Sequence, residues 1–121
     1  MKPVIHGVGT FEHPNLRTFD PDDPGDVAII LEVDIGRRKG KGSDSFALQV
    51  VTPRGIARLP VREDGTITSG RILVVPEYDF DFVWIWLESV VEQCTADSWE
   101  GCVEKLRRKF DWEFEGYREW R

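Results

Sequence analysis

The sequence predicts an α+β domain, in which a mainly antiparallel sheet carries two consecutive helices on one face and ends with a C-terminal strand. Two observations lead to this fold class. Apolar residues alternate with a period of two in the first half of the chain, follow a helical period of about 3.6 from residue 79, and alternate again after residue 110. In addition, 121 residues with 40% hydrophobic positions are typical of one domain with one core. We therefore expect residues 1–121 to form a single domain.

A β-hairpin is predicted in the first half of the chain. Residues 27–35 place apolar side chains on one side and a mixture on the other, as a half-buried strand does. Residues 46–52 alternate in the same way, and the polar, glycine-rich residues 37–42 between them are typical of a hairpin loop. These two strands should therefore pair.

Two further strands are predicted before and after this hairpin. Residues 72–75 form a short β-branched run that ends at Pro76, because proline cannot donate to a sheet ladder. Residues 4–11 form another candidate strand, which two glycines interrupt. The proline- and aspartate-rich residues 20–26 are predicted to form an irregular acidic loop.

A first helix of about four turns is predicted over residues 79–94, behind a cap at Asp79 or Asp81. One face of this helix is apolar and carries Val83, Trp86, Leu87, Val90 and Cys94. The other faces also carry large apolar side chains, namely Phe82, Trp84, Ile85 and Val91. A surface helix needs less apolar area than this, so we expect the helix to be buried on two sides or to form an interface.

A second helix is predicted to begin at the capping-box sequence of residues 97–100, with Asp97 as its cap. After this helix, residues 111–117 alternate again and are interpreted as the last strand. Four side chains of this region should share one core with Leu31, Val33 and Leu48 of the hairpin. The four are Trp99, Leu106, Trp112 and Phe114.

The net charge of −6 arises in the second half of the chain, where residues 61–121 hold fourteen acidic and eight basic side chains. This charge would repel free nucleic acid, so a basic protein surface is the more natural partner. No apolar stretch reaches the roughly 18 residues of a membrane-spanning helix, and the N-terminus has no signal-peptide pattern. We therefore expect a cytoplasmic protein that binds neither nucleic acid nor membrane.

Few residues are candidates for catalysis or metal binding. His6 and His13 are the only histidines, so a small enzyme would have to combine one of them with a carboxylate from another segment. Cys94 and Cys102 match no metal-finger spacing and are interpreted as buried thiols. We expect no catalytic residue, no metal and no cofactor, and we keep the histidine enzyme as an alternative hypothesis.

A series of short motifs follows one another along nearly the whole chain. They are Asp34-Ile35-Gly36, Ser45-Phe46, Val51-Thr52-Pro53, Tyr78-Asp79, Ser98-Trp99-Glu100, and Trp112-Glu113-Phe114-Glu115 with Tyr117. In this order they resemble the immunity protein 8 family of bacterial polymorphic toxin systems. The resemblance implies a small α+β protein that a toxin-producing bacterium makes to neutralise its own toxin or that of its siblings. It implies a toxin domain as the partner and no catalytic residues.

The leading hypothesis is therefore an immunity protein that neutralises a cognate toxin, such as a nuclease, by stoichiometric binding. A strand over residues 111–117 would project Glu113 and Glu115 to the side opposite Trp112 and Phe114. We expect carboxylates of this region and of the acidic loop to form the electrostatic part of a toxin-binding surface. The candidate residues are Glu113, Glu115, Glu119, Asp22, Asp23 and Asp26.

Two alternatives belong to other functional classes. One is the small enzyme that uses His6 or His13 with a carboxylate. The other is an oligomeric structural module, which would associate through the apolar helix at residues 79–94.

Overall fold

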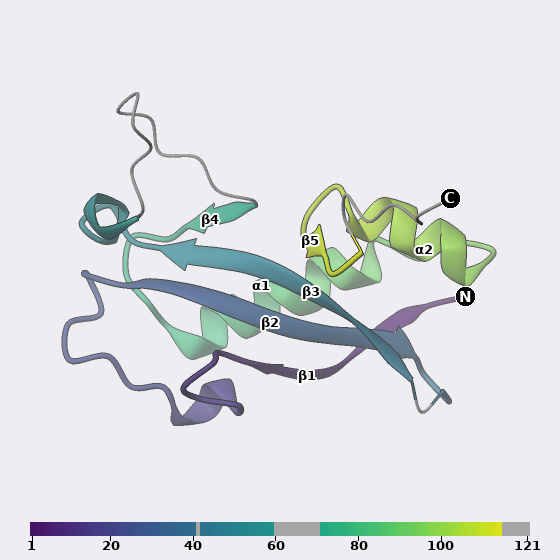
Figure 1. Ribbon diagram of the computed structural model, residues 1–121, viewed down its shortest axis with the longest axis horizontal. Coiled ribbons are helices and arrows are strands. Elements are labelled where there is room, and N and C mark those ends of the chain that lie inside the picture. The colour runs from purple at the N-terminus through teal and green to yellow at the C-terminus, as the bar shows by residue number, and fades with distance from the viewer. Residues whose placement is uncertain (41, 60–70, 115–121) are drawn as a thin grey trace, which may run out of the picture.

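The computed structural model describes residues 1–40, 42–59 and 71–114, and the described part forms a sheet with helices on one face (Figure 1). The strands are β1 (Pro3–Gly9), β2 (Ala28–Arg37), β3 (Ser43–Val51), β4 (Ile72–Val74) and β5 (Asp111–Trp112). The helices are α1 (Phe80–Glu92) and α2 (Trp99–Leu106), with short 3₁₀ helices η1 (Leu16–Thr18) and η2 (Gly55–Arg58). The predicted α+β class is confirmed.

The sheet is built around the β2–β3 hairpin. The strand order is β1-β2-β3-β4, and β5 pairs with β3 beside β4. All described pairings are antiparallel except that of β4, which runs parallel to β3. The predicted strand over residues 4–11 corresponds to β1, which ends at Gly9 and has an irregularity in register between Ile5 and Gly7.

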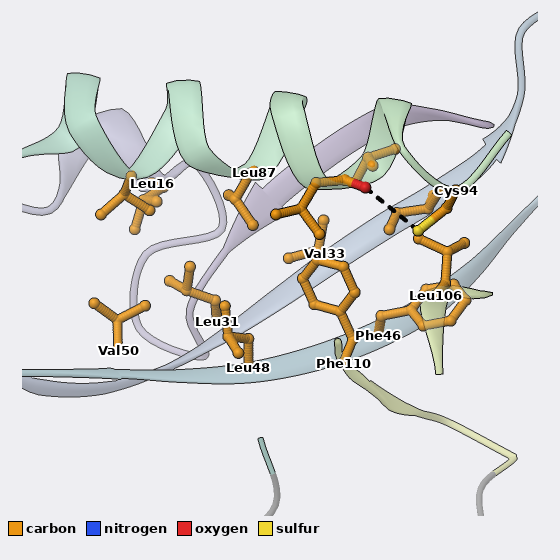
Figure 2. Packing of buried hydrophobic residues seen from close by; sticks show 14 of the residues in the cluster. Leu16, Leu31, Val33, Phe46, Leu48, Val50, Leu87, Cys94, Leu106 and Phe110 are labelled. Carbon is orange, nitrogen blue, oxygen red and sulfur yellow. Dashed lines mark hydrogen bonds between the residues drawn. The ribbon is translucent and has the colours of Figure 1, made fainter. Parts of the chain in front are cut away.

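The alternation of the hairpin separates a buried face from an open face. Side chains of one parity are fully or almost fully buried against the helices (Figure 2), namely Leu31, Val33, Ile35, Phe46, Leu48 and Val50. Side chains of the other parity, which include Ile30, Glu32 and Asp34, project to the opposite face. We call this opposite side the open face, because both α-helices pack on the buried side.

The helix α1 begins at Asp79, whose side chain accepts a hydrogen bond from the Asp81 backbone N–H. Its buried residues face the sheet and are Val83, Leu87, Val90 and Val91. On the other side, Phe82 and Ile85 are 52% and 66% exposed. Burial of the helix on two sides is therefore wrong, whereas its use as an interface stays a prediction.

The helix α2 begins one residue later than expected. The cap is Ser98, whose side chain accepts a hydrogen bond from the Gly101 backbone N–H, so the assignment of Asp97 as the cap is wrong. Ser98 is three residues before Gly101, which is the spacing that brings a capping side chain to an unpaired N–H of the first turn. Cys94 and Cys102 are buried free thiols, as predicted, and burial raises the pKa of Cys94.

The C-terminal strand is confirmed but shorter than predicted, since β5 ends at Trp112 and the chain turns at Glu113 and Phe114. Leu106 belongs to the core, and Trp99 and Trp112 are partly buried against it. The placement of Phe114 in this core is wrong, because the residue is 46% exposed. After the turn, the ring lies edge-on to Trp112 at the surface, with 5.1 Å between centroids. Residues 115–117 of the predicted strand lie outside the described residues.

Candidate protein-binding surface

Three carboxylates from two separate segments gather at one end of the open face. Glu32 and Asp34 project from β2, and Glu113 follows β5. Ser45 of β3 links two of them, because its backbone N–H donates to Glu113 Oε1 at 2.8 Å and its Oγ donates to Glu32 Oε1 at 2.9 Å. Ser45 is also the register partner of Asp34. We call Glu32, Asp34 and Glu113 the carboxylate cluster.

The charges of this cluster repel one another. Partial burial raises the pKa of Asp34, and the neighbouring carboxylates of Glu32 and Glu113 raise it further, while His6 opposes the shift. In the part of the chain that the structure describes, the ion pairs made by Lys and Arg involve none of the three carboxylates. A cation supplied from outside would therefore be favoured at this position.

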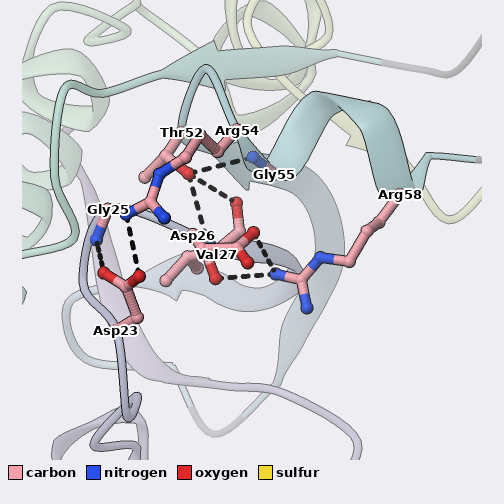
Figure 3. A network of polar contacts seen from close by, with 8 residues as sticks. All are labelled: Asp23, Gly25, Asp26, Val27, Thr52, Arg54, Gly55 and Arg58. Atoms are coloured by element: carbon pink, nitrogen blue, oxygen red, sulfur yellow. Dashed lines mark hydrogen bonds and ion pairs between the residues drawn. The ribbon is translucent and has the colours of Figure 1, made fainter.

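The carboxylates of the acidic loop are in a different environment (Figure 3). Asp23 accepts hydrogen bonds from the Gly25 N–H at 2.9 Å and from Arg54 Nη2 at 2.8 Å, and these two contacts lower its pKa. Asp26 Oδ1 lies 3.2 Å from Arg58 Nη2. Two of the three predicted loop carboxylates thus already have cationic partners within the chain.

The two groups of predicted site residues lie at opposite ends of the hairpin. The acidic loop leads into Ala28, which pairs with Val51 at the end of β3, whereas Glu113 contacts Ser45 near the start of β3. At about 3.3 Å per residue, the distance from residue 45 to residue 51 is about 20 Å. Glu115 and Glu119 lie outside the described residues. The structure therefore joins Glu113 with Glu32 and Asp34, and it does not join Glu113 with Asp22, Asp23 or Asp26.

The histidines also lie apart from each other. His6 is exposed at the irregular position of β1, close enough to Asp34 to influence its pKa, and its Nε2 lies 3.0 Å from the Arg37 carbonyl oxygen. His13 lies in the loop after β1, with its Nδ1 3.3 Å from Thr18 Oγ1 and its ring against Phe19. No group of three or more His, Cys, Asp or Glu side chains suitable for a metal ion occurs among the described residues.

Sequence reasoning missed Glu32 and Asp34 as site residues. The signal was present, since the alternation of residues 27–35 already assigns both to the side opposite Leu31 and Val33. The alternation does not predict that Glu32 and Asp34 lie near Glu113, because this proximity depends on the pairing of β5 with β3.

The fold and the carboxylate cluster define a small α+β domain with a negatively charged sheet surface. The family model for Immunity protein 8 matches residues 4–117, and the chain therefore belongs to this family of immunity proteins. No curated protein and no solved structure matches the chain. Within the described ranges, no helix is long and apolar enough to cross a membrane.

Proposed function

We propose that this chain binds a cognate toxin domain stoichiometrically in the cytoplasm and neutralises it, without a catalytic step of its own. Membership of the Immunity protein 8 family supports the class of partner. The carboxylate cluster supports the position, because Ser45 holds Glu32 and Glu113 on the open face. A toxin surface with Arg or Lys side chains would relieve the repulsion within the cluster and gain charge-assisted hydrogen bonds.

The remaining predicted carboxylates have a secondary part in this proposal. Arg54 and Arg58 offset the charges of Asp23 and Asp26, so these two loop residues attract a basic surface less strongly than the carboxylate cluster does. Asp22 is exposed in the same loop and adds to the long-range attraction. Glu115 and Glu119 follow Glu113 in the sequence and add negative charge to its segment.

The proposal is tested with a candidate toxin domain, to be sought in the reading frame next to this chain's gene. We expect the double variant Asp34→Asn, Glu113→Gln to associate with this toxin about tenfold more slowly at low salt and to show a weaker salt dependence, because electrostatic steering is lost. Stopped-flow association at several salt concentrations and growth protection on co-expression are the measurements. The matched control is Glu88→Gln, which removes an exposed carboxylate from α1.

Two outcomes would count against the proposal. Failure of the unchanged chain to bind the toxin or to protect cells would contradict the function itself. If the double variant and the control both bind the toxin with unchanged kinetics, the carboxylate cluster is not part of the binding site. The proposed function would not be contradicted by that result.

A second candidate function follows from the exposed side chains of α1. Phe82 and Ile85 lie next to each other on the side of the helix away from the sheet, and both are more than half exposed. Such side chains would support an oligomeric module. Sedimentation at high protein concentration tests this alternative, since a monomer there would dismiss it.

A further inference from the structure

One edge of the central hairpin is left without a partner strand. In β1, Gly9 pairs with Glu32, and the chain then turns away, with the Thr10 N–H donating to the His13 carbonyl oxygen at 2.8 Å. The first residues of β2, from Ala28 to Leu31, lie beyond this point (Figure 1). Within the described part of the chain, they pair with β3 on one side and with no strand on the other.

The direction of the backbone groups along this edge follows from the ladder. The Val27 carbonyl oxygen accepts a hydrogen bond from the Thr52 N–H at 2.9 Å, so residue 27 directs its backbone groups toward β3. Because these groups alternate in direction along a strand, Ala28 and Ile30 direct their N–H and C=O groups to the opposite, unpaired edge. A short row of donors and acceptors is therefore available to a further strand.

A hollow of about 450 Å³ lies against this edge. Its apolar lining includes Phe11, Phe19 and Ile30, of which Phe11 is 99% exposed and Ile30 is 61% exposed. Two carboxylates, Glu12 and Glu32, also line it. The hollow thus combines apolar surface with negative charge, which matches a long cationic side chain whose stem is apolar and whose tip is charged.

We infer that the edge of β2 at Ala28 and Ile30 receives an extended segment of the toxin, which lies in line with β1 and places a Lys or Arg side chain in the adjoining hollow. Main-chain hydrogen bonds to an exposed sheet edge provide affinity in this mode of recognition, and side-chain pockets provide specificity. Glu32 belongs to both the hollow and the carboxylate cluster, so one basic segment would contact the two in succession. The inference rests on the proposed function and specifies how the toxin is held.

Hydrogen exchange on the unchanged chain provides a direct test. In the free protein, we expect the amide protons of Ala28 and Ile30 to exchange rapidly, because the described sheet offers them no acceptor. Addition of the purified cognate toxin domain should slow both amides by at least about tenfold. The Ile29 amide faces β3 and is the internal reference, which should change less.

A pair of substitutions at one position tests the main-chain contact. Ala28 is the first residue of β2, where proline is tolerated when its missing N–H would face an open edge. We expect Ala28→Pro to weaken toxin binding at least about tenfold more than Ala28→Val does, because only the proline removes the N–H that the main-chain contact requires. Circular dichroism of both variants confirms that the fold is retained.

A second pair tests the hollow. Ile30→Ser removes an apolar side chain from its lining, whereas Val74→Ser removes one of similar exposure, 53%, which belongs to β4 and does not line it. We expect a loss of affinity of about tenfold for the first substitution and little change for the second. Equal effects of Ile30→Ser and Val74→Ser on affinity would overturn the inference. So would a toxin that binds but does not slow the exchange of the Ile30 amide. Neither outcome would contradict the proposed function. Absence of any toxin binding by the unchanged chain would instead refute both.

Discussion

Thr52 and Val27 hold together the end of the β2–β3 hairpin through side-chain and backbone contacts (Figure 3). The Thr52 Oγ1 accepts a hydrogen bond from the Val27 N–H at 2.9 Å and donates to the Val27 carbonyl oxygen at 3.3 Å. The same oxygen also accepts from the Gly55 N–H at 3.2 Å, at the start of η2. Thr52 is completely buried, so no water replaces these contacts if the hydroxyl is removed.

Thr52→Val should therefore destabilise the protein although it preserves the shape of the side chain. The substitution leaves the buried N–H groups of Val27 and Gly55 without this acceptor, and we expect a loss of about 1–3 kcal/mol in the free energy of unfolding. Urea denaturation measures it. Thr52→Ser keeps the hydroxyl and should lose less. An unchanged stability of Thr52→Val, or a larger loss in Thr52→Ser, would show that packing of the methyl group, and not the hydrogen bonds, is the main contribution of Thr52.

Gly55 should resist substitution because the backbone of Val27 lies against it. A Cβ added at Gly55 would overlap the Val27 carbonyl oxygen. Gly55→Ala must displace main-chain atoms at the end of the hairpin, and we expect a loss of about 1–3 kcal/mol on thermal or urea unfolding. Gly42→Ala is the control, since nothing lies within 4 Å of a Cβ there. A Gly55→Ala variant as stable as the control would contradict the close packing of η2 on the hairpin.

Trp112 and Phe114 should differ in their contributions to stability. Trp112 is partly buried against the core, donates from Nε1 to Asp44 Oδ2 at 3.0 Å, and lies under the Arg107 guanidinium. Trp112→Ala should cost about 2–3 kcal/mol, somewhat less than truncation of a fully buried aromatic residue. Phe114→Ala should cost less than about 1 kcal/mol, because nearly half of its surface is exposed. Equal urea midpoints for Trp112→Ala and Phe114→Ala would contradict the placement of Trp112 against the core and of Phe114 at the surface.

The local pattern of the sequence predicted most elements of this fold, and long-range pairing decided the rest. The alternation in residues 27–35 and the helical period after residue 79 depend on neighbouring positions, so both predict β2 and α1 closely. The parallel pairing of β4 and the early end of β5 depend on where these strands meet β3, which no local period encodes. Phe114 was placed in the core for this reason, since alternation alone does not show where pairing stops.

The candidate site shows the same division. The acidic character of the surface follows from composition. Glu113 follows from that composition together with the alternation of residues 111–117. Which carboxylates remain without cations could not be predicted, because the contacts of Asp23 with Arg54 and of Asp26 with Arg58 join residues about thirty positions apart. Glu32 and Asp34 are the neighbours of Glu113 because β5 pairs with β3, and this pairing is equally invisible to local sequence patterns.

The pH dependence of stability provides a test that links Asp34 to the proposed function. The pKa of Asp34 is raised above its ordinary value near 3.8, first by partial burial and then by Glu32 and Glu113. The folded chain therefore binds this proton more tightly than the unfolded chain does. The stabilisation from this group is fully present below pH 3.8 and is lost as the pH rises through the raised pKa.

Asp34→Asn should accordingly stabilise the protein at pH 7, by up to about 1 kcal/mol, the scale of charge interactions near a surface. Urea midpoints measured between pH 3 and pH 7 should show a gain that shrinks as the pH falls and that is smaller at high salt. The same variant should bind the toxin more weakly, because the charge that costs stability is the one proposed to attract a cation. Glu88→Gln, outside the carboxylate cluster, should show neither effect. If Asp34→Asn is stabilised but binds the toxin as tightly as the unchanged chain, the negative charge of Asp34 does not contribute to toxin binding.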